Sequence, residues 1–202
     1  MFLLLLVLIP LIGIFILSVA LTYNISARNT KLLKIMALAI TIIDLIISLV
    51  IYILFDCSSK QFQFVQEHYQ ISYFDFYLGI DGLSIYFVLL TTIIIPISII
   101  SNWKSIKENT IIFLIIILLL ETSLLIVFLV LDILLFYIFF ESILAPLFIL
   151  IGIFGSSAKI RASFYFFLYT FYIYIAFIKK FKIKSTQIWT ENMKFEASYF
   201  AN

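Results

Sequence analysis

Long uninterrupted apolar runs are the feature that most constrains this chain. Between residues 111 and 154 almost every side chain is apolar. That run is about twice as long as the roughly 20 residues that one helix needs to cross the hydrocarbon core of a bilayer. Asp132 lies near its middle and predicts a tight turn between two antiparallel spans. Segments of this kind can be accommodated only in lipid, so the chain is expected to be an integral membrane protein.

Composition supports a membrane protein and excludes several function classes. Of the 202 residues, 65% are hydrophobic and 12% are charged, whereas a soluble domain has roughly half apolar and about a quarter charged residues. The net charge is only +2, and no basic patch interleaved with aromatic residues predicts nucleic-acid binding. The single cysteine, Cys57, and the single histidine, His68, make a metal or haem site built by this chain alone improbable.

The predicted fold is an all-α, polytopic transmembrane helix bundle of five to six spans. The first span is read as a retained membrane helix, because neither the positively charged segment before a signal peptide's apolar run nor the small-residue cleavage site after it is evident. Alternation near Tyr69 to Tyr77 predicts a short surface hairpin between the second and third spans. The polar, basic stretch 179–202 is expected to lie outside the transmembrane domain 1–178. The predicted spans are 2–22, 35–55, 83–100, 111–130, 133–153 and, less clearly apolar, 162–178.

Loop charges predict the orientation of the bundle. The first, third and fifth loops are rich in Lys and Arg, whereas the second has one Lys and the fourth has none. Because cytoplasmic or matrix loops carry the excess of basic residues, the N-terminus is expected outside and the odd-numbered loops inside. The lysines of 179–202 would lie on the wrong side if the sixth run crosses. The residues used are Arg28, Lys31, Lys34, Lys60, Lys104, Lys107, Lys159 and Arg161.

Two glutamates lie within the predicted spans and are the candidate proton-transfer residues. Glu121 is about 16 Å before the turn at Asp132, and Glu141 is about 14 Å after it, at 1.5 Å per helical residue. The two carboxyls would therefore lie at nearly one depth on neighbouring helices. A charge there costs about 2.5–3.5 kcal/mol on insertion scales, so such acids serve either proton or ion transfer or hydrogen-bonded packing as neutral groups.

Three further residues are expected to have structural roles. Pro146 lacks an N–H and so leaves the carbonyl of Ser142, next to Glu141, without its helical partner. This break could line a polar cavity or be an ordinary proline kink. Asp81, just before the third span, is predicted to cap that helix rather than to take part in catalysis. Asp132 is predicted to be a turn residue.

Several of these segments resemble a known family. Their order and spacing are similar to those of subunit 4 of NADH:ubiquinone oxidoreductase (respiratory complex I), in its N-terminal part, a family related to Mrp-type cation/proton antiporters. The resemblance covers just under half of the chain. It rests on the Leu-Gly-Ile-Asp-Gly-Leu-Ser run at 78–84, the run at 87–92, Leu-Glu-Thr at 120–122, the run from Leu131 to Ser142 with Pro146, and the segments 159–162 and 166–170.

This resemblance implies a core membrane-arm subunit that couples electron transfer from NADH to ubiquinone to proton translocation. In the family, the glutamate that matches Glu141 pairs with a lysine on a later helix, and the one that matches Glu121 recurs. NADH, ubiquinone, FMN and iron–sulfur clusters would belong to the complex, with none bound by this chain. The expected partners are other membrane-arm subunits and the bilayer. The Phe140-Glu141-Ser142 form is typical of mitochondrial members, which predicts the mitochondrial inner membrane.

The sequence departs from the family after Thr170, where a lysine-rich tail follows instead of the family's usual sixth helix. The later helices of the family, with their lysines, are not in these 202 residues, so the chain alone is not expected to pump protons. Three alternatives remain open. The chain could be the complex I membrane-arm subunit, with a second polypeptide that carries the later helices. It could be a truncated or split-gene membrane fragment without independent activity, or it could be a stand-alone cation/proton antiporter.

Overall fold

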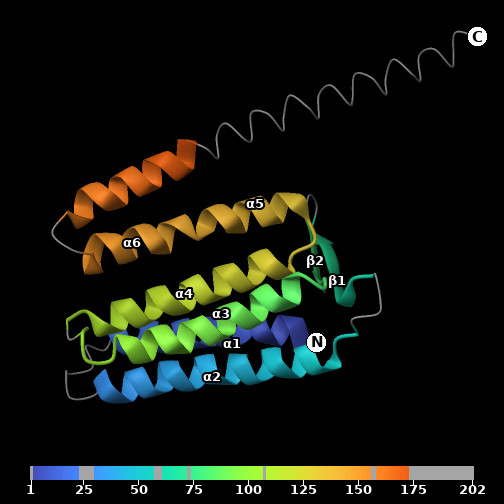
Figure 1. Ribbon diagram of the computed structural model, residues 1–202, viewed down its shortest axis with the longest axis horizontal. Helices are drawn as coiled ribbons and strands as arrows, with labels where there is room; N and C mark the ends of the chain where they lie inside the picture. Colours follow the sequence, from blue (N-terminus) through green and yellow to red (C-terminus); the bar gives the residue numbers. More distant parts are fainter. Residues whose placement is uncertain are drawn as a thin grey trace, which may run out of the picture.

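The computed structural model describes residues 2–22, 30–56, 61–71, 74–106, 108–155 and 158–172. Its helices run back and forth beside one another, and one β-hairpin lies at the end of the bundle where the chain begins (Figure 1). A further helix over 159–172 packs beside α6. The elements are α1 (Phe2–Thr22), α2 (Thr30–Leu54), β1 (Gln63–Ile71), β2 (Phe74–Ile80), α3 (Ser84–Ser101), α4 (Thr110–Leu129), α5 (Ile133–Ser142) and α6 (Leu144–Phe154).

Five helical segments in the described part of the chain are long and apolar enough to cross a membrane, as predicted. The fifth of them joins α5 to α6 and covers Leu135–Phe154. The predicted boundaries agree to within a residue or two, except at the start of α2. There the helix begins at Thr30 rather than at residue 35. For the predicted span 162–178, the described helix ends at 172, and residues 173–178 lie outside the described residues.

The early start of α2 has a physical cause in Lys34. Its ammonium group donates hydrogen bonds to the carbonyls of Trp103 at 2.8 Å and Ile106 at 2.9 Å. It also lies 5.8 Å from the centre of the Trp103 ring. Lysine side chains near helix ends can reach polar groups at the membrane boundary while their methylenes stay in apolar surroundings. A lysine that was expected in a loop therefore belongs to the first turns of a helix.

Helix α4 is the centre of the bundle. It packs against α1, α2 and α3, and on another side against α5 and α6. Fourteen of its residues are buried, far more than in any other described helix. Leu118, Leu125 and Leu129 of α4 are fully buried and join the apolar clusters that connect it to α1 and α3. Groups on the inner faces of α1 to α4 are therefore shielded from lipid.

The predicted surface hairpin is present. Strands β1 and β2 pair in an antiparallel arrangement, with Glu67 opposite Tyr77 and His68 opposite Phe76. The hairpin also contacts the turn between α4 and α5, because the amide of Leu131 donates to the carbonyl of Tyr77 at 3.0 Å. A bridge between Leu78 and Val130 adds to this contact. Cys57 and the side chain of His68 lie outside the described residues.

The connections alternate between the two ends of the bundle, as the loop charges predicted. Lys31 lies in the first turn of α2, Lys104 follows the end of α3, and Lys159 and Arg161 lie in the first turn of the helix over 159–172. These helix ends lie at the end of the bundle opposite the hairpin (Figure 1). Lys34 binds carbonyls of the α3–α4 connection at that same end. One end of the bundle thus carries the described cations and the other carries the hairpin. Which side of a membrane each end faces stays a prediction.

Candidate functional site

A polar layer crosses the interior of α2, α3 and α4. Each of these helices contributes buried oxygen-bearing side chains at positions where a lipid-facing helix would be apolar. Burying a polar group in such surroundings costs free energy unless it finds a hydrogen-bond partner or has a function. The buried side chains of this layer are Thr41, Asp44 and Ser48 of α2, Thr91 and Thr92 of α3, and Glu121, Thr122 and Ser123 of α4.

Two carboxyls of this layer form the candidate site. The side chains of Asp44 and Glu121 are both completely buried. They lie close enough for an electrostatic interaction between them. None of their four carboxyl oxygens has a hydrogen-bond partner among the described residues. A buried carboxylate without a partner is expensive in an apolar medium, so these two groups need either a proton or a cation to be stable there.

Both acids lie near the middle of helices that are long enough to cross a bilayer. Asp44 follows the start of α2 by about 21 Å and precedes its end by about 15 Å, at 1.5 Å per residue. Glu121 is about 16 Å from the start of α4 and about 12 Å from its end by the same rise. Since a bilayer core is about 30 Å thick, neither carboxyl can reach the polar boundary as a lysine side chain can.

Gly13 of α1 allows the helices that carry these acids to come close together. A Cβ atom at this position would lie 2.9 Å from Cδ1 of Ile40 and 3.1 Å from Cδ1 of Leu118. Ile40 is one turn before Asp44 on α2, and Leu118 is one turn before Glu121 on α4. The missing side chain of Gly13 therefore lets α2 and α4 pack against α1 at one place, one turn away from the two acids.

The hydroxyl groups near the acids are already engaged. Ser48, one turn after Asp44, forms a 2.8 Å hydrogen bond with Thr92 of α3, and this bond joins the two helices. Thr41, one turn before Asp44, donates to the carbonyl of Leu38. Thr122 donates to the backbone of its own helix as well. These hydroxyls bond to backbone carbonyls or to each other, and the oxygens of the two carboxyls have no hydrogen-bond partner in the described part of the chain.

No cation of the first four helices is close to the acids. Helices α1 and α3 contain no charged residue, and Glu121 is the one charged residue of α4. Lys31 and Lys34 are the cations of α2. Lys34 is ten residues from Asp44, about 15 Å along the helix, and its ammonium is bonded to carbonyls at the end of the bundle. The described part of these helices thus offers the acid pair no countercharge.

Glu141, the other glutamate predicted for proton transfer, lies elsewhere. It is half-buried on α5, two residues before the break at Ile143 that separates α5 from α6. Pro146 is buried, and its missing N–H explains the break, because it cannot bond to the carbonyl of Ser142. The structure gives Glu121 an electrostatic neighbour on α2. The predicted pairing of Glu121 with Glu141 stays a prediction.

The two predicted structural aspartates occupy turns. Asp132 lies between α4 and α5, and its carbonyl accepts a hydrogen bond from the amide of Phe136 at 2.9 Å. Asp81 precedes α3, but its carboxylate accepts from the adjacent amide of Gly82 at 2.6 Å. Helix α3 has no side-chain cap. The Asp81 carboxylate thus bonds within the turn before the helix, and its backbone carbonyl accepts from the amide of Ile85. The predicted capping role of Asp81 stays a prediction.

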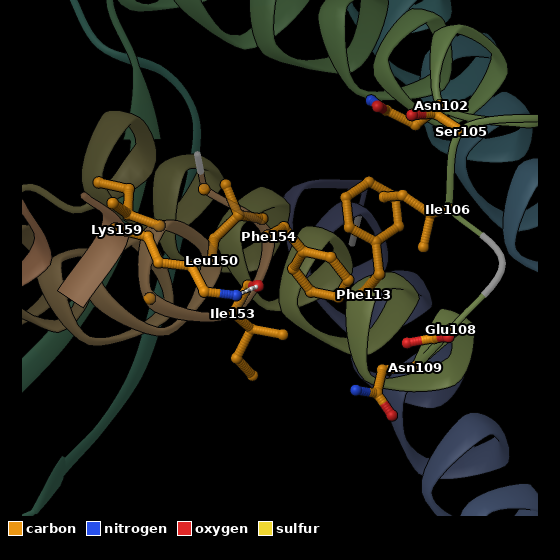
Figure 2. Close-up of a pocket in the computed structure, with 13 residues that line it drawn as sticks. Asn102, Ser105, Ile106, Glu108, Asn109, Phe113, Leu150, Ile153, Phe154 and Lys159 are labelled. Carbon is orange, nitrogen blue, oxygen red and sulfur yellow. Dashed lines mark hydrogen bonds between the residues drawn. The ribbon is translucent and has the colours of Figure 1, made fainter. Parts of the chain in front are cut away.

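A large cavity lies away from the acid pair. It has a volume of about 990 Å³ and lies at the basic end of the bundle, between the α3–α4 connection and the end of α6 (Figure 2). Glu108 and Asn109 line one side of it. Lys159 lines another side and donates to the carbonyl of Ile153 at 2.7 Å.

The described residues contain no group of three or more His, Cys, Asp or Glu that could hold a metal ion.

Asp44 is the candidate residue that the sequence reasoning missed. A signal was present, because Asp44 is the one acidic residue of an otherwise largely apolar 25-residue helix. Its relation to Glu121, by contrast, depends on the rotation of two helices whose acids are 77 residues apart in sequence, which no spacing rule provides. The sequence thus shows an acid within an apolar helix, and the structure shows that Glu121 is its neighbour.

Comparison with known proteins identifies the relatives of this chain. The family model described as NADH:quinone oxidoreductase/Mrp antiporter, transmembrane part, matches residues 130–178. An uncharacterized 50.9 kDa protein in ND4 intron 1 of Podospora anserina is 57% identical, over 82% of this chain and 44% of that protein. NADH-ubiquinone oxidoreductase chain 4 of Mycosarcoma maydis is 47% identical, over 83% of this chain and 34% of that protein.

A solved structure shares the fold. Respiratory complex I from Thermus thermophilus contains a chain with a TM-score of 0.64 and 22% identity, which covers 85% of this chain and 33% of that one. The present chain therefore spans less than half the length of the relatives it matches. The motifs, the family model and the curated relatives agree: the chain is a homologue of the N-terminal part of NADH-ubiquinone oxidoreductase chain 4, and its residues 130–178 match the NADH:quinone oxidoreductase/Mrp antiporter family.

Proposed function

We propose that this chain is a membrane-arm component of NADH:ubiquinone oxidoreductase and takes part in coupling electron transfer to proton translocation. One observation carries the proposal: the part homologous to chain 4 holds two carboxyls, Asp44 and Glu121, buried without hydrogen-bond partners among the described residues at mid-membrane depth. Acids inside membranes are rare because they are costly, and they mark proton relays and ion pathways.

The proposed division of roles follows from where the acids lie. Glu121 and Asp44 would hold protons inside the bundle of α1 to α4. Glu141 would act on α5, outside the bundle of α1 to α4 and beside the break between α5 and α6. There the carbonyl of Ser142, which cannot bond to Pro146, favours a polar partner. The electron-transfer cofactors NADH, FMN, ubiquinone and the iron–sulfur clusters would be bound by other subunits. The chain would thus supply proton-binding groups and no redox chemistry.

Location and partners follow from the same relationship. The apolar spans make this a membrane protein, and its relatives include chain 4 proteins of NADH-ubiquinone oxidoreductases. The proposed site is therefore the mitochondrial inner membrane. The proposed neighbours are other membrane-arm subunits and a polypeptide carrying the helices that complete the relatives' length. In the absence of those helices, liposomes containing this chain alone should show no driven proton uptake.

The test is to isolate complex I from the source membranes on a native gel and to search it for peptides of this chain. Peptides from α2 and α4, together with a peptide from 185–194, should be found in the complex. Replacement of Glu141 by Gln in the assembled complex should then reduce proton uptake per NADH oxidised while the band on the native gel stays intact. Unchanged coupling in an intact complex would contradict the role of Glu141.

A second candidate function has its own supporting observation. The 57% identical relative from Podospora anserina is described as lying in ND4 intron 1. We propose as the alternative that this chain is likewise translated from an upstream exon into an intron, and that residues 179–202 are the intron-encoded part. Under this alternative, peptides from 185–194 would be absent from complex I, which would contain α1 to α5 peptides continuing into a longer chain 4.

A further inference from the structure

Asp44, the buried acid on α2, has no role in the sequence-based prediction that Glu121 and Glu141 transfer protons. Burial of its carboxyl in an apolar interior costs free energy. Asp44 is fully buried, and both of its carboxyl oxygens lack hydrogen-bond partners among the described residues. A residue that only packed would be an apolar side chain or one of the hydroxyls around it. The presence of a carboxyl here calls for a ligand that a carboxyl can hold and a hydroxyl cannot.

We infer that Asp44 and Glu121 form one proton-binding carboxyl pair, in which the two side chains share a proton in the core of the α1–α4 bundle. This rests on the proposed function and deepens it, because it states that the two acids hold one proton between them, whereas the proposed function leaves open whether each acid binds a proton independently. The pair is a property of the described chain itself, so it can be tested whether or not the chain is found in complex I.

Charge balance leads to a proton as the ligand. Two ionised carboxylates close together in an apolar core would repel each other strongly, and they could not both exist without a countercharge. From the other elements packed around α4, the membrane-embedded titratable acid is Glu141 on α5, which adds no positive charge. The cations of α2 lie at the basic end, where Lys34 is held by two carbonyls. A proton shared between the acids supplies both the missing charge and a hydrogen bond.

Packing explains why the pair can form. At Gly13 the side chains of Ile40 on α2 and Leu118 on α4 pack directly against the backbone of α1. The Ser48–Thr92 hydrogen bond fixes α2 against α3 one turn away from Asp44. These two contacts hold Asp44 near Glu121 and restrict the rotation of α2. The carboxyl pair is thus positioned by helix packing, whereas a flexible loop would allow the acids to separate.

The experiment is infrared spectroscopy of the full 202-residue chain in lipid nanodiscs, titrated over pH. Protonated carboxyls absorb at higher frequency than ionised ones, so a shared proton should give a protonated-carboxyl band at neutral pH. E121Q should remove part of this band. In D44N the protonated-carboxyl band of Glu121 should shift in frequency and in the pH range where it appears. D44E keeps a carboxyl and should shift the band without removing it. E141Q is the matched control, since it removes a membrane carboxyl outside the pair.

Three outcomes would overturn the inference. The wild-type chain could show no protonated-carboxyl band at neutral pH, which requires no variant to fold. Alternatively, D44N could leave the band of Glu121 unchanged in frequency and titration, in which case the acids are independent. Finally, exchanging choline for Na⁺ at constant pH could convert the band into an ionised-carboxylate band, which would show that a metal cation occupies the pair. None of these readouts depends on proton pumping, so failure of the proposed function would be seen separately.

Discussion

Replacement of Gly13 by Val tests how tightly α1, α2 and α4 are packed beside the acid pair. The Cβ atom alone would lie 2.9 Å from Ile40 and 3.1 Å from Leu118, closer than ordinary contact. Alanine could be accommodated by small movements of these side-chain ends. The two methyl groups of valine extend further, so α2 or α4 must move away. Overpacking of this kind costs about 1–3 kcal/mol.

The structure offers a matched control on another membrane helix. At Gly152 of α6 a new Cβ would lie 3.6 Å from Oγ of Ser163, which is an ordinary contact distance. Both glycines lie inside helices, so both substitutions gain helix propensity, up to about 1 kcal/mol relative to glycine. Gly152→Val should therefore be neutral to within about 1 kcal/mol, whereas Gly13→Val should lower the free energy of unfolding by about 1–3 kcal/mol.

The assay is reversible unfolding of the full chain in bicelles or mixed micelles, followed by the fluorescence of its two tryptophans, Trp103 and Trp189. At 25 °C a loss of about 1–2 kcal/mol changes the folded-to-unfolded ratio by a factor of about 5–30. Truncation of Leu118 to Ala should make room for the valine introduced by Gly13→Val, so the double variant should be less destabilised than the sum of the two single changes, by about 0.5–3 kcal/mol. Equal effects at both glycines, or strict additivity with Leu118→Ala, would refute the packing argument.

Three further substitutions test contacts described above. Lys34→Met should lower the free energy of unfolding by about 1.5–3 kcal/mol, because two charge-assisted hydrogen bonds are lost; Lys31→Met, an exposed change on the same turn, should have little effect in the same unfolding assay. A double-mutant cycle with Ser48→Ala and Thr92→Val should give a coupling of about 0.6 kcal/mol, and a coupling of zero would show that their hydrogen bond contributes nothing. Pro146→Ala should restore a slowly exchanging amide at position 146, measured by hydrogen–deuterium exchange, because the carbonyl of Ser142 gains its helical partner; rapid exchange there would mean that the helix break has another cause.

The apolar lengths predicted the fold well because membrane spans obey a simple rule. In lipid every backbone group must be bonded within its own helix or a closed sheet, so about 20 apolar residues leave few alternatives. The turn at Asp132 and the hairpin before α3 were also predictable, since each is a short polar interruption between strongly patterned segments. The start of α2 was not, because the long side chain of Lys34 reaches the end of α3 by a route that composition does not reveal.

The candidate site was predictable only in part. Glu121 stood out as an acid in an apolar run, and the structure places it where it is completely buried. Its neighbour depends on the rotation of α2 about its axis, which is set by Gly13 on α1 and by the bond between Ser48 and Thr92. Each of these contacts joins residues far apart in the chain. Sequence spacing gives the depth of a membrane residue, but the partner comes from packing between helices.

The contact between the β-hairpin and the α4–α5 turn has a consequence for how the protein is made. Leu78 meets Val130 across 52 residues of chain, and the amide of Leu131 bonds to Tyr77. The residues between them include α3 and α4, which must both cross the membrane before the two partners are on the same side. During synthesis Tyr77 and Leu78 of β2 are therefore made before Val130 and Leu131, with which they later form contacts. This contact can form only after α3 and α4 have both been inserted in the correct orientation.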